Sequence, residues 1–395
     1  MRFALLLAPL LLCACAAEPA PKPAPRPRHV AVDRGVLRAF RAYVYAGYGL
    51  VLARERPEQA DTATLKERQA LAREELRTAL VDAGADPATL GDDAAKLVAT
   101  VGEGIARGGR YALLARVDGA HTDSVRVVRL RERDLQREVR LFDETFRYRV
   151  TSFDETLVAD YDAWRAEQLG QPAAREVAVY REDGRIQLDL GAAREVGAKL
   201  FLPRVEALAQ AAAAADEEAF VRRADRLAQL LGLAKAVLRW RSLEALWSRI
   251  RSRPPEEQLQ RFVEDYVERA ELRAAAELHA LSHLRGAPPP GQELPPLDDA
   301  ARQRLFELGS LSAAIHGEPL GQVADLLGLA VLSLDGPRHE AHFRAARQLV
   351  LDLVARLRQG PPSDQADARA LAKLARASAE EARALARELH AARAR

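Results

Sequence analysis

The stretch LQREVRLFDETFRYRVTSFDETLVADYDAW, residues 135–164, carries the most regular apolar pattern in the chain. Large apolar side chains recur in steps of three and four, with charged residues at most positions between them. The stripe consists of Leu135, Val139, Phe142, Phe146, Val150, Phe153, Leu157, Tyr161 and Trp164. A narrow stripe of this kind is typical of a long amphipathic helix or of one helix in a coiled coil. We therefore expect one long helix here, packed within its own domain or paired in a coiled coil with a second copy.

Short strand patterns flank this segment on both sides. Residues 111–117 and 124–130 are rich in apolar and β-branched side chains, and Asp118-Gly119 lies between them. Residues 176–190 alternate apolar and polar side chains around Asp183-Gly184, which favours a β-hairpin. The expected order is strand, strand, long helix, strand, strand, with the four strands in one antiparallel sheet against the helix.

Helical periodicity fills the rest of the body. From Asp33 to Gly109 the pattern predicts three helices, which break near Pro57 and Gly84. After Gly191 it predicts helices over 192–214, 216–232, 233–252, 255–285, 298–316, 318–335, 337–359 and 364–394. The predicted fold class is therefore mainly α: a multi-helix array with a small antiparallel β insertion.

This pattern divides the body into four parts. We expect a helical N-terminal part over 29–109 and a middle part of β-hairpins and one long helix over 110–191. A helical region over 192–285 follows, and a helical C-terminal region covers 298–395. We expect the boundary between the last two parts in the proline-rich stretch 286–297.

The first residues have a different character. Arg2 precedes an apolar run from Ala4 to Leu12, which is too short to cross a bilayer that needs about 20 residues. The run ends in Leu12-Cys13-Ala14-Cys15, with a leucine at −3 and a small residue at −1 relative to Cys15. This segment resembles the signal peptide of a bacterial lipoprotein. Cys13 fits the position of the acylated cysteine less well, because the bulky Leu12 would then stand at −1.

The resemblance implies a signal peptide over 1–14, cleavage before Cys15 and acylation of Cys15 with a diacylglyceryl group and a further acyl chain. Residues 15–28 would then form a lipidated cysteine and a stiff proline-rich linker. Ala16 stands where many inner-membrane lipoproteins carry aspartate, so the resemblance implies the outer membrane, with the body facing the periplasm. The alternative is an ordinary secretory signal cut near Ala16 or Ala17.

Composition excludes several classes of function. The two cysteines are Cys13 and Cys15, so the body offers no disulfide, thiol nucleophile or cysteine zinc ligand. The net charge is +2 and acids and bases are interspersed, so we expect no nucleic-acid partner. No phosphate-binding glycine loop and no Gly-x-Ser-x-Gly motif is present, and we assign no catalytic residue.

Histidines are the remaining candidates for site chemistry. His279 and His283 are four residues apart, so they share one face of a helix and could chelate a divalent metal. A third ligand could come from His316, His339, Glu340 or His342, whereas His390 is not counted among the candidates. The alternative is that all of them are ordinary surface or interhelical histidines.

Three functional hypotheses follow. The first is a membrane-anchored envelope lipoprotein with a non-enzymatic binding or structural role, which contacts the bilayer through its acyl anchor and associates with an envelope protein or with itself. It needs no cofactor besides the covalent lipid on Cys15. The second is a metal-dependent periplasmic hydrolase that uses His279 and His283. The third is a carrier of a hydrophobic ligand.

Overall fold

The computed structural model describes residues 30–59, 61–90, 94–115, 125–170, 177–181, 184–285, 297–334 and 341–394. The predicted signal peptide, Cys15, the proline-rich linker and His339 lie outside the described residues. Within these ranges, none of the helices combines the length and the hydropathy that a membrane span requires.

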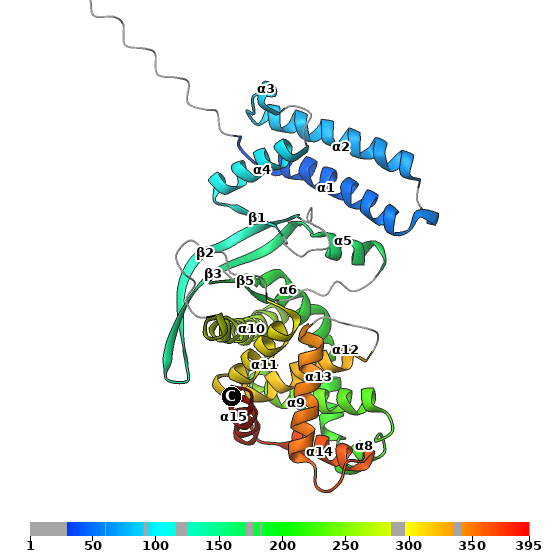
Figure 1. Cartoon of the computed structure of the whole chain (residues 1–395), viewed down its shortest axis with the longest axis vertical. Coiled ribbons are helices and arrows are strands. Elements are labelled where there is room, and N and C mark those ends of the chain that lie inside the picture. The colour runs from blue at the N-terminus through cyan, green and yellow to red at the C-terminus, as the bar shows by residue number, and fades with distance from the viewer. Residues whose placement is uncertain are drawn as a thin grey trace, which may run out of the picture.

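The fold is mainly α with a small β insertion, as the sequence predicts. A group of N-terminal helices lies at one end of an elongated molecule, a larger helical array lies at the other end, and a five-stranded sheet lies between them (Figure 1). The N-terminal elements are α1 (Arg34–Glu55), the 3-10 turn η1 (Pro57–Gln59), α2 (Thr62–Asp82), α3 (Pro87–Leu90) and α4 (Ala94–Gly108). The three helices predicted in this part are confirmed as α1, α2 and α4.

Tyrosines of α1 attach the N-terminal helices to the sheet. The hydroxyl of Tyr48 donates to the carbonyl of Val125 (3.1 Å) and accepts from the N–H of the same residue (3.0 Å). The hydroxyl of Tyr45 accepts from the N–H of Ala159 (3.0 Å), which directly follows the adjacent antiparallel strand at the same end of the sheet. The two hydroxyls thereby supply partners for backbone groups at one end of the sheet, where β2 begins and β3 ends, which fixes where α1 lies on it.

The sheet consists of β1 (Tyr111–Ala115), β2 (Val125–Leu141), β3 (Glu144–Val158), β4 (Ala178–Arg181) and β5 (Arg185–Asp189). Its strand order is β1-β2-β3-β5-β4. The predicted strands near 111–130 are confirmed as β1 and the start of β2, and the hairpin predicted over 176–190 is confirmed as antiparallel β4 and β5. The sheet is mixed rather than antiparallel throughout, because β3 pairs with β5 in parallel.

The prediction of one long helix over 135–164 is wrong. The predicted coiled coil and the predicted order of strand, strand, long helix, strand, strand depended on that helix, so they are wrong as well. Residues 135–141 and 144–158 belong to β2 and β3, which form a hairpin with Phe142 in its turn. Only Tyr161 and Trp164 of the stripe lie in a helix, α5 (Tyr161–Gln168). In β3, Phe146, Tyr148 and Val150 are shielded while the residues between them are exposed, which is the period of a strand.

Apolar residues four apart fit a strand as well as a helix, since four is a multiple of two. Two steps of three in the stripe, from Val139 to Phe142 and from Val150 to Phe153, lie in the hairpin and imitate the period of a helix. Two features of the hairpin cause them. One is the two-residue turn after Leu141, and the other is a change of face at Phe153, opposite irregular pairing in β2. Asp134, with φ of 51°, lies in that irregular stretch, where a bulge adds residues to β2.

The C-terminal array begins directly after β5. Its elements are α6 (Leu190–Glu195), the π-helical turn η2 (Val196–Phe201), the 3-10 turn η3 (Leu202–Arg204), α7 (Val205–Ala213), α8 (Glu217–Val221), α9 (Leu227–Ile250), α10 (Pro255–Arg285), α11 (Asp299–His316), α12 (Pro319–Leu332), α13 (Ala341–Leu357), α14 (Asp364–Arg376) and α15 (Ala379–Ala394).

Helices predicted over 255–285, 298–316, 318–335 and 337–359 correspond to α10 to α13. The predicted 192–214 helix is interrupted by η2 and η3, and the break expected at 232/233 lies instead between α8 and α9.

The helix predicted over 364–394 is two helices, because Ser378 begins a new one. Its hydroxyl accepts from the N–H of Glu381 (3.1 Å), and the Glu381 carboxylate accepts from the N–H of Ser378 (2.7 Å). This reciprocal pair is a capping box, which supplies partners for backbone groups that a helix start leaves open.

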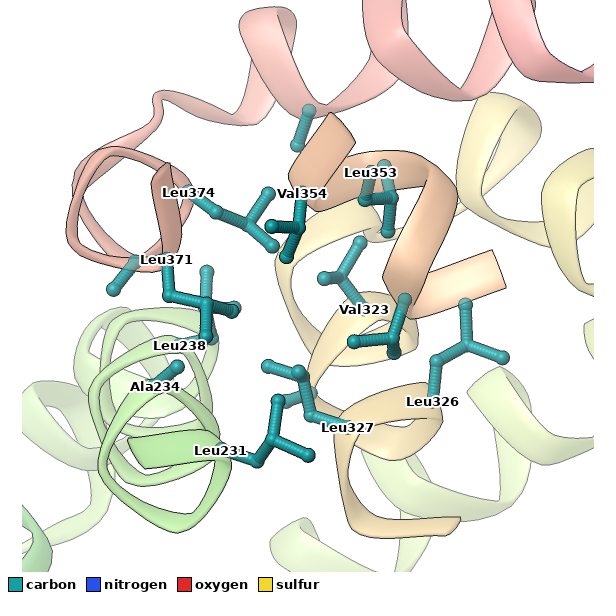
Figure 2. Packing of buried hydrophobic residues seen from close by; sticks show 14 of the residues in the cluster. Leu231, Ala234, Leu238, Val323, Leu326, Leu327, Leu353, Val354, Leu371 and Leu374 are labelled. Carbon is teal, nitrogen blue, oxygen red and sulfur yellow. The ribbon is translucent and has the colours of Figure 1, made fainter. Parts of the chain in front are cut away.

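Apolar side chains from α9, α12, α13 and α14 meet in the largest buried cluster of the array (Figure 2). The cluster includes Leu231 and Leu238 of α9, Leu327 of α12, Leu353 of α13 and Leu371 of α14. Buried alanines between them let the helices approach closely, so a chain with few aromatic residues still fills its core.

Candidate metal centre at the hairpin tip

The β2–β3 hairpin extends beyond the sheet and runs alongside the helical array (Figure 1). Tyr148 and Val150 of the hairpin pack against a face of α10 that presents Ala274, Ala275 and Leu278. Small side chains on that face allow the strands to lie close to the helix. This packing directs the tip of the hairpin toward the C-terminal half of α10.

A buried carboxylate on α10 fixes the stem of the hairpin. Glu271 Oε1 accepts from the hydroxyl of Tyr148 (2.9 Å), and its Oε2 pairs with Arg137 Nη1 (2.6 Å). Burial raises the pKa of Glu271 above its usual value, while the Tyr148 hydrogen bond and the Arg137 charge act in the opposite direction. One helix residue therefore holds a residue from each strand.

A close crossing of α10 and α11 brings further residues to the tip. Gly309 of α11 lies against Glu277 of α10, where an added Cβ would be 2.3 Å from Glu277 Cγ and 2.8 Å from its Cα. No side chain fits at that distance, so glycine is required for the two helices to come together. Near this crossing the ring of Phe142 in the hairpin turn lies between the two helices, with its centroid 6.5 Å from that of His279 on α10 and 4.6 Å from that of His316 at the end of α11.

Phe142 forms the turn of the hairpin and contacts two of the helices. Its backbone adopts φ of 54°, which is uncommon for a residue with a side chain. Its N–H donates to His316 Nε2 (3.0 Å), and its ring centroid lies 4.6 Å from that of His316 and 4.8 Å from that of His390 on α15. Because a backbone amide can only donate, His316 Nε2 carries a lone pair there. Burial lowers the pKa of His316 and of His390, so both rings are neutral at pH 7.

Glu144, the first residue of β3, meets the two histidines of α10. Its Oε2 lies 3.2 Å from His279 Nε2 and 3.3 Å from His283 Nε2, and the two Nε2 atoms are 3.0 Å apart. The three atoms form a nearly equilateral triangle. Its sides match the roughly 3.3 Å between neighbouring ligand atoms of a tetrahedral zinc ion with bonds of about 2.0–2.1 Å.

Protonation states at this triangle suit metal ligation. Burial lowers the pKa of His279, and the nearby carboxylate only partly opposes that effect. The hydrogen bond with His279 holds the pKa of Glu144 below its usual value. At pH 7 an anionic Glu144 carboxylate therefore faces a neutral His279 imidazole, and these are the forms of the two side chains that bind metals. His279 is buried, whereas the side chains of Glu144 and His283 are 61% and 56% exposed, so solvent reaches one side of the triangle.

The sequence identified part of this group. His279 and His283 do share a helix face and converge on one point, whereas His316 is close by but uses Nε2 to hold the hairpin turn. His342 lies elsewhere on α13, with its ring 4.1 Å from that of Phe343. His339 and Glu340 lie outside the described residues.

Two residues of the cluster, Glu144 and His390, were missed. His390 lies beside Phe142 because α15 packs on α11, and no local sequence pattern predicts that packing. Glu144 becomes a partner of α10 only when residues 125–158 are strands, and the alternation of Phe146, Tyr148 and Val150 was the signal for that.

Comparisons with protein-family models, with curated proteins and with solved structures give no match to this chain.

Proposed function

We propose that this protein is a lipid-anchored protein of the bacterial cell envelope, whose helical body has a non-enzymatic binding or structural role in the periplasm. The observation that carries the proposal is the leader, in which Arg2, the apolar run Ala4–Leu12 and Ala14-Cys15 follow in the order of a lipoprotein signal. Two or more acyl chains on one cysteine suffice for stable anchoring. Ala16 favours the outer membrane over the inner one.

The body is suited to a role in binding or spacing. It is elongated, and the sheet joins the N-terminal helices to the C-terminal array (Figure 1). Outside the leader the sequence contains no cysteine, which removes thiol chemistry from the body. The partner under this proposal is another envelope protein or a second copy of the chain.

The structure bears differently on the two alternative functions, the carrier of a hydrophobic ligand and the metal-dependent hydrolase. An open hollow between α13, α14 and α15 is lined by charged residues that include Arg369, Lys373, Arg376 and Glu388, which does not favour an apolar ligand. The convergence of His279 and His283 favours the metal-binding part of the hydrolase hypothesis.

Matched cysteine variants test the anchor. The full chain is expressed in a Gram-negative host with a clickable fatty acid, either unaltered or as Cys15→Ser or Cys13→Ser. We expect label and membrane association in the unaltered chain and in Cys13→Ser, and loss of both in Cys15→Ser. Label retained by Cys15→Ser, or lost from Cys13→Ser, would contradict the proposal.

The binding role is tested on the Cys13→Ser/Cys15→Ser chain, which is free of lipid and thiol. Size-exclusion chromatography and capture from a detergent extract of the envelope should give a defined oligomer or a stoichiometric envelope partner. A strict monomer that captures no envelope protein would count against this role while leaving the anchor intact.

A further inference from the structure

We infer that Glu144, His279 and His283 bind one divalent transition-metal ion of the zinc class, which clips the tip of the β2–β3 hairpin onto α10. This site lies in the body, so it stands whether or not Cys15 carries lipid. Its ligands come from two elements that are more than a hundred residues apart in the sequence.

Hydrogen bonding alone cannot account for the triangle of atoms. A neutral imidazole offers Nε2 either as a donor or as an acceptor, and an ionised carboxylate only accepts. If both Nε2 atoms carry protons, their contact at 3.0 Å sets one donor against another. If only one carries a proton, the other Nε2 sets its lone pair against Glu144 Oε2.

A cation removes this conflict, because all three atoms then direct lone pairs at it. An ion with bonds of about 2.0–2.1 Å to the three atoms would lie roughly 0.9 Å out of their plane. The exposed side of the triangle leaves room for a water molecule as the fourth ligand, since the side chains of Glu144 and His283 are both more than half exposed. The triangle is therefore compatible with a four-coordinate ion that has three protein ligands and one water molecule.

The ligand types indicate the class of metal. Calcium and magnesium prefer all-oxygen sites, whereas two imidazoles and one carboxylate suit Zn²⁺ and also Co²⁺, Ni²⁺ or Fe²⁺. His316 and His390 lie beside the site as supports, because they hold Phe142, two residues before the carboxylate ligand. The ion would thus secure the tip of a hairpin whose stem is already held by Glu271.

Cobalt provides a spectroscopic test. The full chain with Cys13→Ser/Cys15→Ser is freed of metal with a chelator and titrated with Co²⁺, and the visible d–d bands are recorded with competition by Zn²⁺. We expect one ion per chain, with bands of a four- or five-coordinate centre that zinc abolishes. Absence of saturable binding at one equivalent would overturn the inference.

Variants separate this site from adventitious binding. Glu144→Gln and His283→Ala change exposed side chains and should leave the fold intact, which circular dichroism verifies. Each should weaken metal binding at least about tenfold, whereas the controls Glu138→Gln, on the same hairpin, and His342→Ala, on α13, should not change it. If Glu144→Gln binds like Glu138→Gln, the hairpin supplies no ligand and the clip is wrong.

Discussion

Removing a single hydroxyl from Tyr148 should loosen the hairpin from α10. Tyr148 is 7% exposed, and its hydroxyl donates to Glu271, whose side chain is 8% exposed, at 2.9 Å. Hydrogen bonds to buried charged groups contribute about 1.5–3 kcal/mol, and phenylalanine fills the same space without leaving a cavity. Because Arg137 still pairs with Glu271, we expect the lower half of that range, about 1.5–2 kcal/mol, for Tyr148→Phe.

Two measurements check this value. Urea unfolding of the thiol-free chain should show the loss of stability, and hydrogen exchange should show faster exchange along β2 and β3 than in α9. Glu138→Gln is the matched control, since its pair with Arg147 is 3.5 Å long and exposed, and such pairs contribute about 0–1 kcal/mol. If Tyr148→Phe behaved like the control in both experiments, the hydrogen bond from Tyr148 to Glu271 would not be what holds the hairpin to α10.

Three further predictions concern other parts of the fold. Gly309→Ala should destabilise the chain by about 1–3 kcal/mol in urea unfolding, because its Cβ would collide with Glu277. By contrast, Gly232→Ala in α9, with no neighbouring atom within 4 Å, should stabilise it by about 0.5–1 kcal/mol, and equal effects would contradict the crossing. Ser378→Ala should cost about 0.5–2 kcal/mol and speed amide exchange in the first turn of α15, and unchanged exchange would rule out the capping box. Burial and a hydrogen bond to Glu55 raise the pKa of Tyr161 to about 12, so its contribution to stability is complete below pH 10 and falls as the pH rises toward 12. Ultraviolet titration of the phenolates should show a late phase that Tyr161→Phe diminishes, and a single midpoint near 10 for all tyrosines would disprove the shift.

The sequence predicts the fold class and most of the helices because their signals are local. Prolines, caps and apolar periodicity define α10 to α13 within a few residues, and Asp-Gly with flanking alternation locates β4 and β5. The break between α14 and α15 could also have been found, since Ser378 and Glu381 have the spacing of a capping box.

The hairpin was missed for a physical reason. A stripe of apolar residues three and four apart describes both an amphipathic helix and a bulged hairpin whose turn shifts the phase. Packing against the alanine face of α10 decides between them, and that face is distant in the sequence. Periodicity alone therefore gives the wrong element for residues 135–158, although the alternation from Phe146 to Val150 favoured a strand.

In the candidate site, too, the residues with a local sequence signal could be predicted and those positioned by tertiary packing could not. Two ligands four residues apart on one helix, His279 and His283, are visible in the sequence. Glu144 is supplied by tertiary structure, and its role depends on the hairpin that the pattern concealed. His390 joins the cluster through the packing of α15 on α11, which again has no local signal.

X-ray absorption at the zinc edge tests most directly whether the hairpin and α10 share an ion. The thiol-free full chain is loaded with one equivalent of Zn²⁺ and compared with its Glu144→Gln variant. The unaltered chain should give two imidazole nitrogens and at least one oxygen at about 2.0–2.1 Å, and the variant should give a lower occupancy or an altered shell. An all-oxygen shell, or identical spectra from the two chains at equal loading, would contradict the metal clip.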